Sequence, residues 1–156
     1  MNARKISYII GGIMTLLATF LFSLHRYFPG VDFYGIGFIL NIPTYFTSGD
    51  IITIVMASVF VIFLLSGIFI LIGLKSRVLA IIGSLLAIVA GVYFILVFYL
   101  GILDISQFAF MFLNPSIIEG IIPLNLPPIG TVSIAPVLVL VGGLLGLIGG
   151  INRTGW

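Results

Sequence analysis

The sequence predicts an all-α integral membrane protein with four transmembrane helices, and two observations carry this prediction. Of the 156 residues, 62% are hydrophobic and only 6% are charged, whereas a soluble domain has about 25% charged residues. Four apolar runs lack Asp, Glu, Lys, Arg and His, and each has roughly the 20 residues with which a helix crosses a bilayer. These runs are residues 6–24, 51–74, 78–103 and 132–151 of one membrane domain, residues 1–156.

The four runs are expected to be helices and not strands. A membrane-crossing strand needs about ten residues that alternate between apolar and polar, and these runs do not alternate. In lipid every backbone polar group must be bonded internally, as it is in a helix. The first run follows Arg4 and Lys5 like a signal peptide, but its apolar stretch is too long and no small-residue cleavage site follows it. We therefore interpret it as the first membrane helix.

The distribution of charge predicts that both termini are cytoplasmic. Five of the six bases lie before the first run, between the second and third, or after the fourth. An even number of spans puts these three places on one side of the membrane, and an excess of Lys and Arg marks the cytoplasmic side. The five bases are Arg4, Lys5, Lys75, Arg77 and Arg153, and the four acids on the other side are Asp32, Asp50, Asp104 and Glu119. The predicted location is the cell membrane, with several spans.

Two long apolar segments, residues 25–50 and 104–130, are expected to face outward as loops. Thr47–Asp50 offers N-cap residues for the second helix. In the second loop, Asn114 followed by proline predicts a short helix over residues 115–119. Residues 32–40 in the first loop are interpreted as a short strand or as a segment that lies in the membrane interface.

Several kinds of function are disfavoured by the residues that the runs lack. Ionisable residues inside a membrane mark proton relays, ion paths and substrate sites, so their absence argues against a pump, a proton-coupled transporter or an intramembrane protease. The chain has one histidine and no cysteine, which argues against haem held by two histidines and against thiolate metal sites. His25, with a carboxylate such as Asp32 as a partner, is a weaker candidate for a metal or pH-sensitive site than for an interfacial anchor. No catalytic residue, cofactor or metal is expected, and six bases make no nucleic-acid footprint.

Small residues at intervals of four predict close helix packing. In the fourth run three glycines lie on one face of a helix, and the third run repeats the pattern, so that another helix can approach backbone to backbone. The residues predicted to form this interface are Gly142, Gly146, Gly150, Gly83, Ala87 and Gly91. The partner helix is expected within the same bundle, and the alternative is a different chain.

The second loop is apolar enough to predict that something covers it. A contiguous apolar surface marks an interaction site, and a long loop in a compact domain is usually functional. The residues predicted to bind a partner are Phe108, Phe110, Phe112, Ile117, Ile118, Ile121 and Ile122. A neighbouring subunit is the preferred cover, and the first loop is the alternative.

These features favour a non-catalytic accessory subunit of a larger prokaryotic membrane complex, with other membrane subunits and lipid as partners. Complexes that handle electrons or gases are one class that fits. The alternatives are a self-associating channel or carrier for a neutral solute, and a self-assembling viral-envelope or cell-surface protein. The layout resembles that of claudins and tetraspanins, but the loop cysteines of both families are missing. The residues proposed to line a channel are Thr53, Ser58, Ser66 and Ser84.

Overall fold

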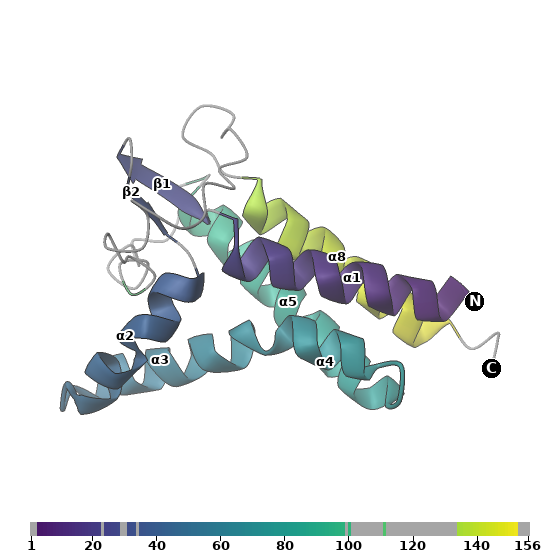
Figure 1. Ribbon diagram of the computed structural model, residues 1–156, viewed down its shortest axis with the longest axis horizontal. Helices are drawn as coiled ribbons and strands as arrows, with labels where there is room; N and C mark the ends of the chain where they lie inside the picture. The colour runs from purple at the N-terminus through teal and green to yellow at the C-terminus, as the bar shows by residue number, and fades with distance from the viewer. Residues whose placement is uncertain are drawn as a thin grey trace.

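Four helices pack side by side and form a bundle (Figure 1). The computed structural model describes residues 3–22, 24–28, 31–33, 35–98, 100, 111 and 134–152. Within the bundle α8 packs against both α1 and α5, and α4 packs against the same two helices. The bundle helices are α1 (Ala3–Phe20), α4 (Ser66–Ile72), α5 (Arg77–Phe98) and α8 (Ala135–Ile151).

Two further helices, α2 (Gly35–Thr47) and α3 (Ile51–Leu64), pack on each other. They form an arm that leaves the bundle at an angle (Figure 1). An antiparallel hairpin of two short strands, β1 (His25–Phe28) and β2 (Val31–Phe33), precedes the arm in the chain. The described residues are thus predominantly helical, with this hairpin as their only sheet.

The segment 25–50 was expected to be a loop with a short strand or an interface-lying segment over residues 32–40, but the structure folds it into the hairpin and α2. Residues 32 and 33 do lie in the short strand β2, whereas residues 35–40 belong to α2, which was not expected. Gly35 and Gly37, with Pro43 further along, indicate a break in helical structure when the sequence is considered alone. Tertiary contact overrides that local preference. Phe38 is completely buried, and an added Cβ at Gly35 would meet the backbone of Thr19 at the end of α1. Glycine therefore allows α2 to begin directly against α1.

The run 51–74 was expected to be one continuous helix, but the structure divides it at Leu65 into α3 and α4. Leu65 keeps a right-handed helical conformation, with φ −77° and ψ −10°. The next two residues are Ser66 and Gly67, and Ser and Gly pairs are a recognised cause of sharp kinks in helices. The break lets α3 leave the bundle while α4 stays inside it.

Two helices among the described residues are long and apolar enough to cross a membrane. They are Ile51–Ile72, which takes α3 and α4 together, and Arg77–Val97. They coincide with the second and third runs of the sequence. The helix Ala135–Ile151 is also apolar, but it has only 17 residues.

The first helix is displaced along the chain from its expected position. It was expected over 6–24, whereas α1 spans Ala3–Phe20 and therefore includes Arg4 and Lys5. Hydropathy locates the apolar stretch of a chain, but helical hydrogen bonding continues through arginine and lysine because both are good helix formers.

The cap expected for the second membrane helix is confirmed. Asp50 is the N-cap of α3, and its carboxylate accepts hydrogen bonds from the backbone N–H of Ile52 at 3.3 Å and of Thr53 at 2.9 Å. Gly49, in the turn before it, has φ +74°, which is a left-handed conformation that glycine adopts without strain. The turn and the cap together set where α3 begins.

Candidate functional site

The glycine face of α8 is buried against its own chain. A Cβ at Gly142 would lie 2.8 Å from the carbonyl oxygen of Gly11 in α1. A Cβ at Gly146 would lie 2.5 Å from the hydroxyl of Ser84 in α5, and one at Gly150 would lie 2.7 Å from an isoleucine of the same helix. These distances are shorter than real Cβ contacts, so α1 and α5 approach α8 too closely for a side chain. The face is covered within the chain and offers no free surface to a second one.

The small residues of α5 contact two different helices. A Cβ at Gly83 would lie 2.7 Å from the carbonyl oxygen of Ser66 in α4, whereas one at Gly91 would lie 2.9 Å from the backbone nitrogen of Leu140 in α8. Ala87, between the two glycines, has no exposed surface. This face therefore passes from α4 to α8 along the length of α5.

The hydroxyls proposed to line a channel do not converge. Thr53 donates to the carboxylate of Asp50 at 2.6 Å. Ser58 and Ser84 each donate to the carbonyl four residues earlier in their own helix, at 2.8 and 2.6 Å. Ser66 is completely buried, and its hydroxyl has no partner within the described residues. This arrangement does not favour a polar path through the bundle.

Aromatic rings join the arm to the bundle. Phe94 of α5 is 1% exposed. Its ring centre lies 5.4 Å from that of Phe63 and 6.5 Å from that of Phe60, both in α3. Phe60 in turn lies 5.7 Å from the ring of Phe38 in α2. Aromatic pairs at these separations stabilise beyond the area they bury, so this cluster holds the arm in place.

An apolar groove runs beside the aromatic cluster, between α3 and α5. Its volume is about 400 Å³, and its lining is entirely apolar. Val59 on α3 and Val89 on α5 line it and are 51% and 68% exposed. The groove is therefore a candidate interaction surface on the outside of the molecule.

The loop residues predicted to bind a partner, together with the short helix expected over residues 115–119, lie outside the described residues. One residue of that loop, Met111, is described and is 6% exposed. The hydroxyl of Tyr45 in α2 donates to its carbonyl oxygen at 2.7 Å. Burial raises the pKa of Tyr45, and a hydrogen bond with Asn41 opposes this effect. At this point the second loop is held by a helix of the first.

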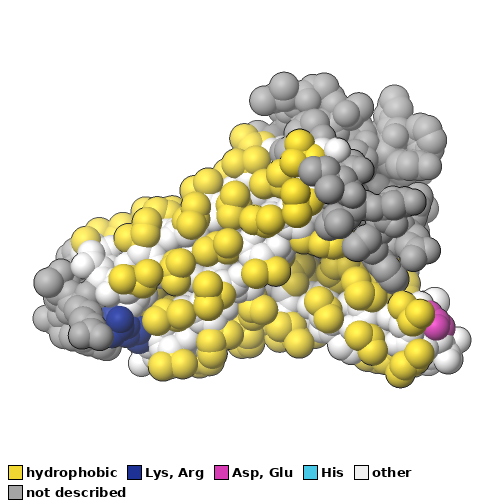
Figure 2. Space-filling view, turned by 180° about the vertical axis from the view of Figure 1, so that it is seen from behind, with side chains coloured by type: hydrophobic (Ala, Val, Ile, Leu, Met, Phe, Trp, Pro, Cys, Tyr) yellow, Lys and Arg dark blue, Asp and Glu magenta, His cyan; other side chains and the backbone are white. Residues whose placement is uncertain are grey.

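Basic residues gather at one end of the bundle, where α1 and α5 begin and α8 ends. The Nε of Arg77 donates to the carbonyl oxygen of Gly150 at 2.6 Å, and a cation at a helix C-terminus is favourable. The Nε of Arg4, which is buried, donates to the hydroxyl of Tyr8 at 3.2 Å. Figure 2 shows a Lys and Arg patch and an acidic patch at opposite ends of a largely hydrophobic surface. The acidic patch belongs to the arm, where α3 begins at Asp50.

His25 lies in β1, where the register pairs it with Phe33. In the backbone register of the hairpin, the residue opposite Asp32 is Arg26 and not His25. Within the described part of the chain, no group of three or more His, Cys, Asp or Glu residues is placed to hold a metal.

Comparison with protein-family models, with curated proteins and with solved structures finds no match to this chain.

Proposed function

We propose that this chain is a membrane-embedded, non-catalytic subunit of a larger membrane protein complex, and that a transmembrane helix of a partner packs on α3. The observation that carries the proposal is the exposed apolar face of α3 beside the groove. Four positions at alternating spacings of three and four make up this face. They are Ile52, Val55, Val59 and Ile62, with exposed fractions between 48% and 59%.

The membrane location rests on the distribution of side chains over the helices. Large apolar residues are exposed along every helix of the bundle, for example Ile10 at 47%, Val89 at 68% and Ile148 at 56%. A soluble protein rarely exposes contiguous apolar patches larger than a few hundred Å². We propose four spans. Two are Ile51–Ile72 and Arg77–Val97, which are long and apolar enough to cross a membrane, and the other two are α1 and α8. Both termini are then cytoplasmic, because the basic end of the bundle holds the start of α1 and the end of α8.

The arm supports a docking role for α3 in particular. Positions spaced by three and four residues form a seam along one side of a helix, and a second helix packs on such a seam. The neighbouring groove of about 400 Å³ gives room for the side chains of that second helix. The helices α1, α4, α5 and α8 pack mainly on one another, whereas α3 packs mainly on α2 and on the end of α5.

The proposal is tested by site-specific crosslinking in native membranes. A photoreactive residue at Val59, in the groove, is compared with one at Ile148, which is similarly exposed on α8 and lies outside the groove. We expect Val59 to give one protein adduct of constant mass and Ile148 to give lipid adducts. The same partner must co-purify in a fixed ratio with the unmodified chain, and Val59→Arg must remove it. Identical adducts at both positions, or a solubilised particle with the mass of the chain alone, would refute the proposal.

The loop residues predicted to bind a partner are tested separately. If the second loop anchors the same partner, replacing Phe108, Phe110 and Phe112 together with serine leaves insertion intact and removes the partner. Retention of the partner by this variant would restrict docking to α3.

A further inference from the structure

The basic end of the bundle is assembled from three parts of the chain. Gly149, near the end of α8, lies against Tyr8, since a Cβ there would be 3.0 Å from the tyrosine ring. A Cβ at Gly73, in the turn after α4, would lie 3.3 Å from the same ring. The first two turns of α1, the α4–α5 turn and the end of α8 therefore meet at one place. The bases of this end within the described residues are Arg4, Lys5, Lys75 and Arg77.

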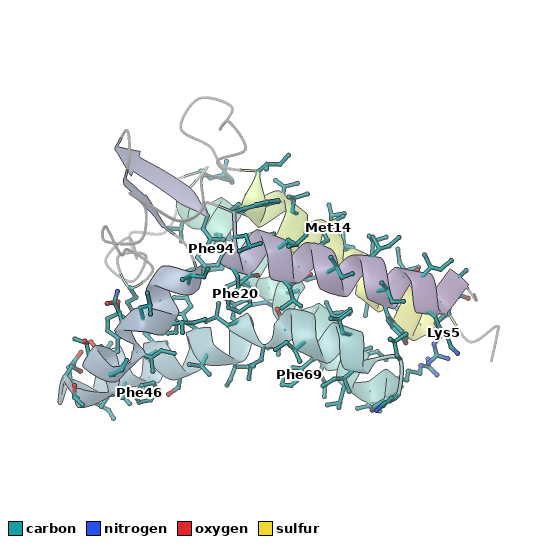
Figure 3. All side chains as sticks on the ribbon, in the orientation of Figure 1. Lys5, Met14, Phe20, Phe46, Phe69 and Phe94 are labelled. Atoms are coloured by element: carbon teal, nitrogen blue, oxygen red, sulfur yellow. The ribbon has the colours of Figure 1, made fainter. Side chains whose placement is uncertain are left out.

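The four bases divide into two that are engaged within the fold and two that face outward. Arg77 is bonded to the last turn of α8, and Arg4 is buried against Tyr8, with its guanidinium 5.6 Å from the ring centre. Lys5 and Lys75 are exposed. Within the described residues neither ammonium group has a hydrogen bond or an ion pair. Figure 3 labels Lys5 at this end of the bundle, in the first turn of α1.

Exposed apolar residues adjoin each exposed base. Ile6 follows Lys5 and is 37% exposed, and Leu74 precedes Lys75 and is 39% exposed. Val78, two residues after Ser76, is 66% exposed. The molecule that covers this end must therefore present negative charge to the lysines and hydrocarbon to the adjoining residues.

We propose that Lys5 and Lys75 bind the phosphate groups of anionic phospholipids, whose acyl chains lie along the apolar residues beside them. This inference rests on the proposed membrane location. A basic residue near an anionic membrane surface gains about 1 kcal/mol of binding free energy, which is about a fivefold change in association constant. An acidic protein or free phosphate would account for the charge but not for the hydrocarbon surface at each lysine.

The experiment uses the full chain reconstituted in nanodiscs. Spin-labelled phosphatidylglycerol and phosphatidylcholine report the association constant of each lipid at the protein surface. We expect the wild type to prefer phosphatidylglycerol, and the preference to fall by up to about fivefold for each lysine removed in Lys5→Gln and Lys75→Gln. High salt should weaken the preference because it screens exposed charges. The matched control is Arg26→Gln, which removes a base from β1, at the other end of the molecule (Figure 1).

The outcomes separate this inference from the proposed function. A wild type that an alkaline wash releases from native membranes would refute the membrane location itself. A wild type that inserts but binds both lipids equally would overturn the lipid site alone, as would a double variant with undiminished preference. If inorganic phosphate added at constant ionic strength abolishes the preference, the lysines bind free phosphate and the lipid site is overturned. If the double variant loses an acidic protein but keeps its lipid preference, the lysines bind that protein and the lipid site is overturned.

Discussion

At the scale of single residues, the smallest side chains mark the closest contacts of the bundle. Gly142 and Gly146 lie where α8 meets α1 and α5, and an added Cβ at either would be closer to its neighbours than real Cβ atoms are. Thr15 and Ser84, which face these glycines, donate their hydroxyls to carbonyls of their own helices. The hydroxyl groups are thereby satisfied without a partner across the interface. Close packing here depends on shape and not on hydrogen bonds between helices.

Gly146→Leu should destabilise the bundle. The added side chain would collide with Ser84 and with Ile70, whose nearest carbon would be 3.0 Å from the new Cβ. Overpacking of this kind typically costs about 1–3 kcal/mol. The measurement is thermal unfolding of the purified chain in detergent. Val141→Leu is the control, because Val141 is 38% exposed on the same helix, and it should leave the midpoint unchanged. An unchanged midpoint for Gly146→Leu would mean that α8 does not pack as described.

Asp50 should make the stability of the arm depend on pH. The hydroxyl and then the backbone N–H of Thr53 hold the pKa of Asp50 below its ordinary value, while desolvation opposes them and the backbone N–H of Ile52 adds to them. Because the pKa is lower in the folded state, this stabilisation is present above the ordinary carboxyl pKa and is lost as pH falls through the lowered one. Asp50→Ala should lower the melting midpoint near neutral pH and abolish this acid-dependent loss.

Asp50→Asn is the matched control for the cap. Asparagine caps helices about as well as aspartate, so this variant should keep most of the neutral-pH stability while it loses the titration. The comparison requires melting midpoints of the three proteins across the acidic range. A wild-type acid dependence identical to that of Asp50→Asn would contradict the assignment to Asp50.

At the scale of elements, the arm is the feature that distinguishes this chain from a plain four-helix hairpin bundle. At the break at Leu65, α3 turns away from the direction of α5. The helix α2 packs on α3 and buries Phe38 there. The groove between α3 and α5 stays open. The aromatic cluster and the contact of Gly35 with Thr19 hold the two groups of helices together.

Phe94→Ala should loosen the arm. Phe94 of α5 is almost completely buried against α3. Removing a buried phenylalanine side chain typically lowers the free energy of unfolding by about 3–5 kcal/mol. Phe46 is the matched control, since it is 43% exposed on α2, and Figure 3 shows it toward the outer part of the arm. Phe46→Ala should change the unfolding midpoint in detergent far less. Equal losses for the two variants would show that the cluster does not join arm and bundle.

At the scale of the whole molecule, charge is separated along its length. The bases lie where α1 and α5 begin, and Asp50 lies at the far end of the arm (Figure 2). A helix of 22 residues such as α5 is about 33 Å long, which matches a hydrocarbon core of about 30 Å. The length of α5 and the separation of charge both support the proposed membrane location.

Single cysteines should report opposite sides of the membrane. In intact cells, Ser48→Cys in the α2–α3 turn should react with an impermeant maleimide. Ser76→Cys in the α4–α5 turn should react only after permeabilisation, because the positive-inside rule places it in the cytoplasm. Both labels are read by mass shift on gels. The reverse pattern would invert the orientation, and labelling of both sites in intact cells would remove the proposed spans.

The sequence by itself determined the features that depend on neighbouring residues. The apolar runs, the separation of charge and the cap at Asp50 follow from hydropathy and from hydrogen bonds between residues two or three positions apart. The small-residue faces could be recognised as packing faces, but the helices that cover them could not be assigned. Spacing along one helix shows which residues share a face, and only the fold shows what that face meets.

The tertiary structure alone decided the arm. The helix α2 forms against local preference, whereas the break at Leu65 has a local cause in Ser66 and Gly67. Contacts between residues far apart in the chain decide where both α2 and α3 then lie. Phe38 meets Phe60, and Gly35 meets Thr19, across separations that no local pattern records. The groove exists because α3 leaves the bundle and α5 does not. Such contacts depend on how whole helices are placed. That placement is determined by which surfaces are buried in the fold, and the periodicity of the sequence does not record it.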